Sequence, residues 1–246
     1  MKISIVIPAY NEALNLPDTI HAFYNELLSN HIPHEILIVN DNSKDNTEEI
    51  IDELKKSIPT LNSIYNPPPN NGFGYAIRKG LENFNGDCVA LVMADLSDSP
   101  KDLISFYNEM LLNKVDCVFG NRFLNKGDVI NYPRKKLYIN RFVNNVLSFV
   151  FGIKYTDCTN AFKLYSKKTI EGLKPFISPH FNITVELPLK AIVRGYSYSI
   201  LPNKWANRKH GVSNLKIREM GSRYFFIVLY CLVEKYFSKG DFNKKW

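Results

Sequence analysis

Short apolar runs and longer amphipathic stretches alternate along the first half of the chain. The apolar runs at 3–7, 35–39, 89–93 and 115–119 have the length and β-branched content of buried strands, and a short third strand is expected around 63–66. Between them, apolar residues recur at helical spacing, which predicts helices beginning near residue 17, over 45–56, through 77–81 and over 101–113. Strands and helices that alternate in this way predict an α/β fold, with a mostly parallel, doubly wound sheet and helices on both faces.

The regular alternation stops after Arg122. Residues 126–155 are basic and aromatic, and an apolar stretch at 142–153, preceded by basic residues, predicts an amphipathic helix. Further on, 157–165 predicts a strand, 182–194 a helix and 197–205 an extended segment. Within a tail at 218–235, an apolar run at 224–233 lies between basic residues. The second half of the chain therefore departs from a simple βα repeat.

The composition is that of a folded, basic protein. With 246 residues, 45% of them hydrophobic and 22% charged, the chain can bury one large core, which excludes disordered and disulfide-stapled classes. The net charge of +7 favours anionic partners: phosphorylated small molecules, acidic membrane surfaces or nucleic acid. Of these, nucleic acid is the weakest prediction, because no recognition motif accompanies the charge. The four cysteines have no metal-ligand spacing, so we expect reduced, buried thiols.

The sequence predicts a cytoplasmic protein. The first apolar run spans only 3–7 before Pro8, which is too short for the core of a signal peptide. No segment reaches the roughly 18–20 apolar residues of a membrane-spanning helix. The basic and apolar stretches at 142–153 and 224–233 suit interfacial helices, which would make a peripheral contact at the inner face of the membrane, directly or through a membrane partner. Core packing or a homodimer interface is the alternative use of these stretches.

Polar side chains cluster directly after two of the predicted strands. Asp95, Ser97 and Asp98 follow the strand at 89–93, and Asp41 follows the strand at 35–39. Because parallel strands bring their carboxyl ends to one edge of the sheet, these groups predict a ligand site there. Oxygen ligands suit Mg²⁺ or Mn²⁺, and such a cation offsets the charge of a phosphorylated ligand. The alternative is that the acids cap the following helices.

A series of motifs resembles the family 2 glycosyltransferases of the GT-A fold. The motifs are IVIPAYNE at 5–12, IVNDNSKDNT at 38–47, NNGFGYAIRKG at 70–80, ADLSD at 94–98, GNRF at 120–123 and DCTNAFKLY at 157–165. Each is weak alone, and their order and spacing carry the resemblance. Within the family, the chain is most similar to the dolichyl- or polyprenyl-phosphate mannosyl- and glucosyltransferase branch, over residues 3 to about 216.

The resemblance implies a Rossmann-like GT-A domain at 1–216. Its nucleotide-sugar half is expected at 1–125 and its acceptor half at 126–216, with an amphipathic C-terminal tail at 217–246. The donor's base and ribose would be held by the loops after the first two strands, at Pro8, Ala9, Tyr10, Glu12 and Asp41. A carboxylate suits this role because it accepts hydrogen bonds from base N–H groups. Turn formation and helix capping are the alternative roles for these residues.

The resemblance also implies a phosphate clamp, formed by the motifs at 70–80 and 120–123. Gly72 and Gly74 permit close approach of the backbone, with Arg78 or Lys79 nearby, and Arg122 matches the family's arginine after the fifth strand. The two glycines do not form a dinucleotide fingerprint, because its third glycine is absent. The alternative is that the glycines serve only the loop and that Lys79 is a solvated charge.

The family's metal motif is altered in this chain. The pattern Asp-x-Asp, with an oxygen ligand two residues on, falls on Met93, Asp95 and Ser97. A thioether is a poor ligand for a hard cation, so Asp95 is expected to carry the Mg²⁺ or Mn²⁺ site with Ser97 or Asp98 as helpers. The affinity for the metal would then be lower than is typical of the family, or the dependence of the reaction on the metal would be altered.

The acceptor half lacks the signature of polysaccharide synthases, since the chain contains no glutamine for their Gln-x-x-Arg-Trp motif. A phosphate acceptor is already ionised near neutral pH and needs no general base, whereas a sugar hydroxyl does. The family's acidic residue in the acceptor half, a candidate catalytic base, corresponds to Asp157 or Glu186. The candidate ligands of an acceptor phosphate are Arg122, Arg134, Arg141, Arg208 and Lys216, the last two in RKHGVSNLK at 208–216.

The resemblance therefore implies an inverting hexosyltransferase. Its donor would be a UDP- or GDP-linked sugar, and its acceptor a polyprenyl- or dolichyl-phosphate-type lipid. Transfer to a glycan hydroxyl in cell-surface polysaccharide synthesis is the first alternative. A nucleotide-sugar-binding module with impaired catalysis is the second, and Met93 is the residue that suggests it.

Overall fold

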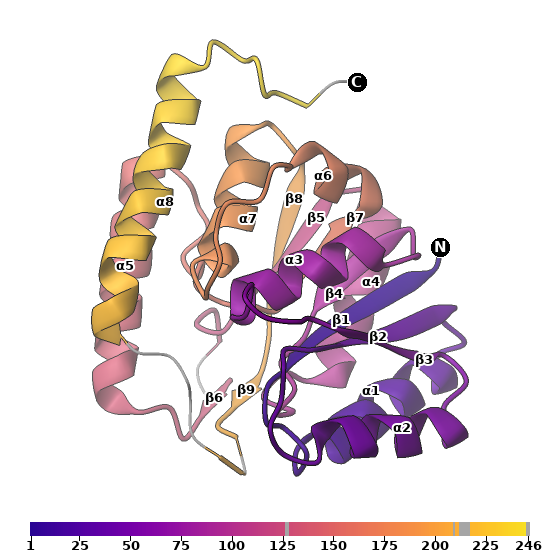
Figure 1. Cartoon of the computed structure of the whole chain (residues 1–246). Helices are drawn as coiled ribbons and strands as arrows, with labels where there is room; N and C mark the ends of the chain where they lie inside the picture. The colour runs from indigo at the N-terminus through magenta and orange to yellow at the C-terminus, as the bar shows by residue number, and fades with distance from the viewer. Residues whose placement is uncertain (126–127, 209, 212–216, 245–246) are drawn as a thin grey trace.

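The structure is a computed structural model that describes residues 1–125, 128–208, 210–211 and 217–244. Its centre is a seven-stranded sheet of order β3-β2-β1-β4-β7-β5-β8, shown in Figure 1. The strands of this sheet are β1 (Ile3–Ala9), β2 (His34–Asn40), β3 (Leu61–Tyr65), β4 (Cys88–Leu91), β5 (Cys117–Asn121), β7 (Lys163–Ser166) and β8 (Tyr198–Pro202). A small parallel pair, β6 (Val129–Ile130) and β9 (Trp205–Ala206), lies beside it. The α/β prediction is confirmed.

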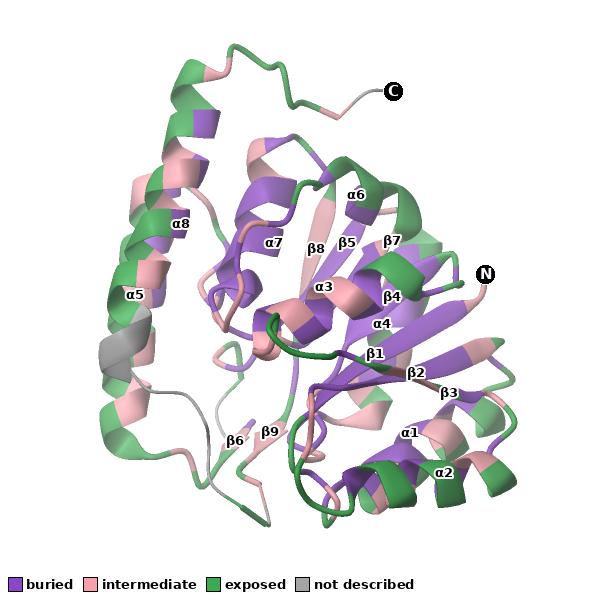
Figure 2. Cartoon of the chain, in the orientation of Figure 1, coloured by how far each residue is buried: buried purple, intermediate pink, exposed green. Residues whose placement is uncertain are grey.

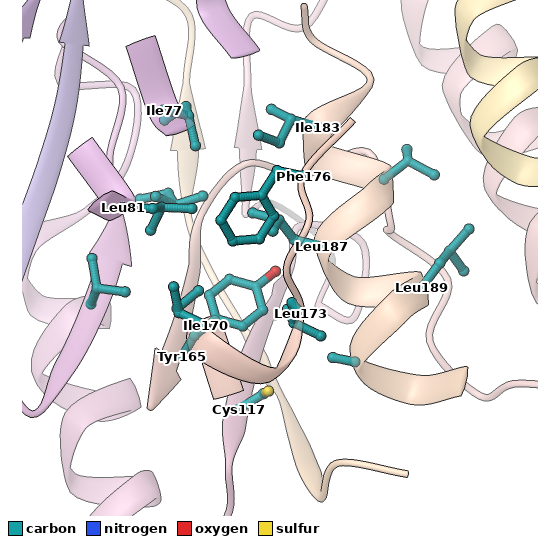
Figure 3. Close-up of a cluster of buried hydrophobic side chains, with 14 of the residues drawn as sticks. Ile77, Leu81, Cys117, Tyr165, Ile170, Leu173, Phe176, Ile183, Leu187 and Leu189 are labelled. Carbon is teal, nitrogen blue, oxygen red and sulfur yellow. The ribbon is translucent and has the colours of Figure 1, made fainter. Parts of the chain in front are cut away.

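Helices cover both faces of the sheet, as predicted. The helices are α1 (Leu16–Ser29), α2 (Thr47–Ser57), α3 (Phe73–Asn83), α4 (Pro100–Asn113), α5 (Arg134–Phe151), α6 (Lys167–Gly172), α7 (Ile183–Val193) and α8 (Ile217–Phe237). Of these, α5 and α8 stand together beside the sheet domain (Figure 1). One apolar core lies between the sheet and α1, α2 and α4, and a second lies under α3, α6 and α7. Figure 3 shows the second core, in which Leu81, Phe176 and Leu187 meet. Because successive strand side chains point to opposite faces, β1 contributes Ile5 to the first core and Val6 to the second.

One strand breaks the parallel order. β7 pairs antiparallel with both β4 and β5, while the other neighbours in the sheet are parallel. The predicted strand at 157–165 is therefore wrong in its first half, because only Lys163–Ser166 is extended in the sheet. Residues 157–160 instead turn, with the N–H of Asn160 donating to the carbonyl of Asp157 at 3.0 Å. This turn brings Asp157 under the end of β5.

The helix predicted at 142–153 begins earlier than expected. α5 starts at Arg134, directly after Pro133, so the basic residues that were predicted to precede the helix form its first two turns. Proline at the N-cap position and the absence of Gly or Pro within 134–151 account for the longer helix. α6, β6 and β9 are too short to give a periodic signal and were not predicted.

α8 is anchored to the sheet domain through α7. Arg194 donates from Nε and Nη2 to the carboxylate of Glu234, at 2.6 and 2.8 Å, and both side chains are buried. Lys235 Nζ also donates to the carbonyl of Phe151, at 2.7 Å, which joins α8 to α5. Figures 1 and 2 show these two helices side by side, with exposed residues on their outer faces. Among the described helices, none is both long enough and apolar enough to span a bilayer.

Candidate functional site

A cavity of about 1140 Å³ lies at the carboxyl ends of the parallel strands. Its walls come from the loops that follow β1, β2, β4 and β5, and from the first halves of α5 and α8. Of the residues predicted from the sequence, the structure brings together in this wall Pro8, Ala9, Tyr10, Glu12, Asp41, Gly72, Asp95, Ser97, Asp98, Arg122 and Arg208. A ligand site at this edge is what a doubly wound sheet favours.

Asp41, at the end of β2, holds the loop that carries the glycines. Its Oδ1 accepts a hydrogen bond from Asn66 Nδ2 at 2.7 Å, and its Oδ2 accepts one from the backbone N–H of Gly72 at 2.8 Å. The side chain is buried yet still contributes to the cavity wall. Asp41 therefore holds Gly72 and its loop in place at the cavity wall.

The two predicted glycines have different surroundings. Gly72 has a φ of +134°, a conformation that residues with a Cβ rarely adopt, and it lines the cavity. Gly74 lies in α3, and a Cβ there would come within 2.5 Å of the backbone of 178–180. Its small size is therefore needed for packing α3 against that segment, and Gly74 is not part of the cavity wall.

Three charged side chains meet at the edge of the cavity that the sequence predicts to bind the donor, here called the donor edge. Glu12 follows β1 and Asp95 follows β4, and these two strands are neighbours. Arg208 lies between the two acids: its Nη2 is 3.0 Å from Glu12 Oε1 and 2.7 Å from Asp95 Oδ2, and its Nε is 2.9 Å from the same Asp95 oxygen. Burial lowers the pKa of the Arg208 guanidinium, but Asp95 and Glu12 outweigh burial and raise it. Arg208 was predicted at the acceptor phosphate, and here it pairs with donor-side acids.

The metal motif provides few oxygen ligands from the protein. Asp95 accepts the backbone N–H of Ser97 at 3.2 Å, and Asp98 accepts that of Met93 at 3.3 Å. Burial, and then the charge of Asp95, raise the pKa of Asp98 to about 7. Within the described part of the chain, no three His, Cys, Asp or Glu side chains gather as a metal-binding group. These residues fit a divalent cation that is shared with a diphosphate, since Mg²⁺ keeps waters and takes one or two carboxylates plus phosphate oxygens.

Arg122 and Asp157 form a buried ion pair below the cavity. Asp157 accepts from the Arg122 backbone N–H at 3.0 Å, from Nε at 2.9 Å and from Nη2 at 2.7 Å. Burial lowers the pKa of Arg122, but the charge of Asp157 outweighs it and raises the pKa. The carboxylate is fully buried and does not line the cavity, so the structure gives Asp157 the task of fixing Arg122. Residue spacing along the chain could not reveal this pair.

Glu186, the other predicted acid, lies in α7 away from the cavity wall. Its carboxylate accepts the backbone N–H groups of Ile177 and Ser178, at 2.9 and 2.7 Å, and pairs with Lys190 at 2.6 Å. These bonds are structural, because the two backbone N–H groups belong to the segment that packs on Gly74. The geometry therefore does not favour Glu186 as a base.

The remaining predicted cations, Arg78, Arg134 and Arg141, lie on different parts of the chain, in α3 and α5. Arg78 stacks on Tyr75, 5.4 Å from the ring centre, and Arg134 is exposed at the start of α5. Arg141 lies over Phe123, at 5.0 Å, in a separate hollow of about 430 Å³. Neither Arg78, Arg134 nor Arg141 lines the large cavity. Lys216 lies outside the described residues.

Several wall residues from the second half of the chain were not predicted. Tyr132 lies just before α5, Lys136 and Asn140 lie in its first half, Tyr224 lies in α8, and Trp205 lies in β9. The backbone of Trp205 also forms an isolated antiparallel β-bridge with that of Asp98, which joins β9 to the metal motif. The basic and aromatic composition of 126–155 was the only sequence signal for this wall.

Comparisons with known proteins agree with the motifs. The family described as Glycosyl transferase family 2 matches residues 4–173. The polyprenol monophosphomannose synthase of Mycolicibacterium smegmatis is 28% identical over 86% of this chain and 80% of its own length. A dolichyl-phosphate beta-glucosyltransferase of Trichomonas vaginalis is 32% identical over 89% of this chain and 69% of its own length.

The fold also matches solved structures. Glucosyl-3-phosphoglycerate synthase from Mycobacterium tuberculosis, in complex with Mn²⁺, UDP-glucose and phosphoglyceric acid, superposes with a TM-score of 0.70. The match covers 94% of this chain and 79% of that one, at 15% identity. At this identity the likeness establishes the GT-A architecture.

Proposed function

Because this chain belongs to glycosyl transferase family 2 and is a nucleotide-sugar glycosyltransferase, we propose that it moves a hexose, with inversion, from a UDP- or GDP-linked donor to a polyprenyl- or dolichyl-phosphate-type lipid. The two relatives named above, a polyprenol monophosphomannose synthase and a dolichyl-phosphate glucosyltransferase, support this class of acceptor. We also propose the corresponding division of the chain: donor half 1–125, acceptor half 126–216 and tail 217–246.

The observation that carries the proposal is the continuity of the cavity. One wall contains Asp41 and Asp95 of the donor half, and the other contains Lys136 of α5 and Tyr224 of α8. A nucleotide sugar and a second substrate can therefore meet in a single space. The second substrate would approach from the side of α5 and α8, the two helices whose outer faces are apolar.

The reaction would proceed by direct displacement. An oxygen of the acceptor phosphate attacks the anomeric carbon on the face opposite the leaving group, and the bond from that carbon to the diphosphate oxygen breaks with its electron pair on the diphosphate. Arg122 Nη1, which takes no part in the bonds to Asp157, is placed to bind a phosphate in the cavity. A divalent cation near Asp95 would supply further stabilisation of the leaving diphosphate.

The placement of the acids favours a phosphate acceptor over a hydroxyl. A hydroxyl needs a general base within hydrogen-bond reach, and Asp157 and Glu186 are both committed to buried structural pairs. An ionised phosphate needs no base. Transfer to a glycan hydroxyl therefore becomes the second candidate.

A peripheral membrane contact through α5 and α8 is the second part of the proposal. On α5, Tyr138, Phe142, Val146 and Phe149 are exposed at helical spacing, so they share one face. On α8, Phe225, Leu229, Val233 and Tyr236 do the same. The basic residues of α5 are Arg134, Lys135, Lys136 and Arg141, and this helix has no acidic residue. Apolar stripes with basic neighbours suit an anionic bilayer surface.

Vesicle binding tests this contact. We expect the protein to cosediment with vesicles that contain anionic lipid, and raised salt to weaken the binding because part of the attraction is electrostatic. Replacing Phe149, which is 88% exposed, by Ser should reduce binding about tenfold or more, since burying a Phe side chain contributes roughly 1.5–3 kcal/mol.

Leu112→Ser is the matched control for that experiment. Leu112 is 80% exposed on α4, on the opposite side of the sheet, and its replacement should leave vesicle binding unchanged. Equal loss in both variants, or no binding by the wild type, would show that α5 and α8 are not a membrane surface. A shift to dimers in place of vesicle binding would assign the face to a second copy.

The acceptor itself is tested by assaying UDP and GDP sugars with polyprenyl phosphate. We expect one donor to give a lipid-linked sugar phosphate. Turnover only with glycan acceptors would favour the hydroxyl alternative. Donor binding with no turnover on any acceptor would favour an impaired binding module.

A further inference from the structure

Arg208 occupies the position between the two donor-edge carboxylates. Two of its N–H groups bond to Asp95 Oδ2, at 2.7 and 2.9 Å, and Nη2 also reaches Glu12 Oε1 at 3.0 Å. The remaining oxygens are engaged as well: Asp95 Oδ1 accepts from Ser97 N–H, and Glu12 Oε2 accepts from Asn15 Nδ2 at 2.6 Å. The pair of acids is therefore fully hydrogen-bonded without any ligand.

The guanidinium is needed there for electrostatic reasons. The side chains of Glu12, Asp95 and Arg208 are 10%, 8% and 14% exposed, so water screens them only in part. Two carboxylates at the ends of neighbouring strands repel each other unless a cation lies between them. The guanidinium of Arg208 is that cation, although Arg208 lies 113 positions from Asp95 along the chain.

We propose that Arg208 and a divalent cation compete for Asp95, and that the donor's diphosphate drives the exchange by drawing the guanidinium onto its own oxygens. The same carboxylate oxygen, Oδ2, cannot bind two guanidinium N–H groups and a metal ion together. The inference rests on the proposed donor site and deepens it: Arg208 is a positioning residue that offsets part of the negative charge of Glu12 and Asp95 until a phosphate arrives.

The altered metal motif makes this competition effective. If residue 93 were an aspartate, the metal could bind its carboxylate while Arg208 held Asp95. The thioether of Met93 cannot do this, because it is a poor ligand for a hard cation. Arginine also suits the second half of the exchange. Its planar N–H fork matches phosphate oxygens, and its pKa is high enough that it stays charged in either position.

Mn²⁺ binding without nucleotide tests the first half of the exchange, by electron paramagnetic resonance of the free ion. We expect Arg208→Ala and Arg208→Gln to bind Mn²⁺ at least about 10-fold more tightly than the wild type, because Glu12 and Asp95 lose their competing cation. The gain should disappear in Arg208→Ala/Asp95→Asn. The control is Lys136→Ala, which removes a positive charge from the cavity wall without touching Asp95 and should change Mn²⁺ affinity less than about 3-fold.

Pyrophosphate binding, measured by calorimetry in EDTA, tests the second half. We expect Arg208→Ala and Arg208→Gln to bind metal-free pyrophosphate at least about 10-fold more weakly than the wild type, the opposite direction to their Mn²⁺ affinity. If the variants only damaged the structure of the site, they would bind both Mn²⁺ and pyrophosphate more weakly. Unchanged Mn²⁺ affinity in both Arg208 variants, an equal gain in Lys136→Ala, or a gain that survives Asp95→Asn would overturn the inference. Neither measurement uses an acceptor, so failure of the proposed lipid-phosphate transfer leaves these outcomes readable.

Discussion

Asp95→Ala is expected to lower sugar transfer by about 100- to 1,000-fold while the protein remains folded. The size of the effect is that of losing one fixed group that stabilises charge developing in the transition state. Asp95 is the acid of the metal motif that lines the cavity at the end of β4, and Met93 cannot replace it. The measurement is kcat with saturating donor, alongside the thermal unfolding curve.

Asp95→Asn is the isosteric companion, and it should show a similar loss because it keeps the shape and removes the charge. Wild-type-like turnover in both variants would show that transfer does not depend on this carboxylate. Loss of activity together with loss of the folding transition would point to a structural role, in which Asp95 serves mainly to pair with Arg208.

Asp157→Ala is expected to lower the free energy of unfolding by about 3–5 kcal/mol. The change leaves the Arg122 guanidinium buried without its partner, and breaking a buried ion pair in this way is strongly destabilising. Chemical denaturation measures the difference. If Asp157 were instead a catalytic base, the variant would lose activity with its stability intact.

An exposed ion pair serves as the control. Asp52 and Lys55 lie 3.1 Å apart on α2, with side chains that are 61% and 34% exposed. Asp52→Ala should change the free energy of unfolding by less than about 1 kcal/mol, because solvent screens such pairs. Similar values for Asp52→Ala and Asp157→Ala would contradict the structural role of the Arg122–Asp157 pair.

The sequence was most informative where function depends on local pattern. A buried strand followed by polar residues predicted that Asp41 and Asp95 lie at one edge of the sheet, and the structure has both in one cavity wall. The strands and helices of the first half were predicted for the same reason, since each has its own periodicity. The order β3-β2-β1-β4 is that of a doubly wound sheet.

Long-range pairing could not be predicted. Nothing in the local pattern indicates that Arg208 reaches Asp95, or that Asp157 is used to fix Arg122. The sequence predicted a strand at 157–165, but its pattern gives neither the antiparallel direction of β7 nor its place between β4 and β5. The early start of α5 was missed because its basic first turns resemble a loop in composition.

The proposed lipid-phosphate acceptor is tested most directly by comparing two acceptors that differ only in the phosphate. Polyprenyl phosphate and the polyprenol of the same chain length are incubated with the enzyme, a divalent cation and a labelled nucleotide sugar. We predict transfer to polyprenyl phosphate, giving an inverted sugar–phosphate linkage that mild acid cleaves, and no transfer to the alcohol. Transfer to the alcohol, or to a glycan hydroxyl with none to the lipid phosphate, would contradict the proposed acceptor.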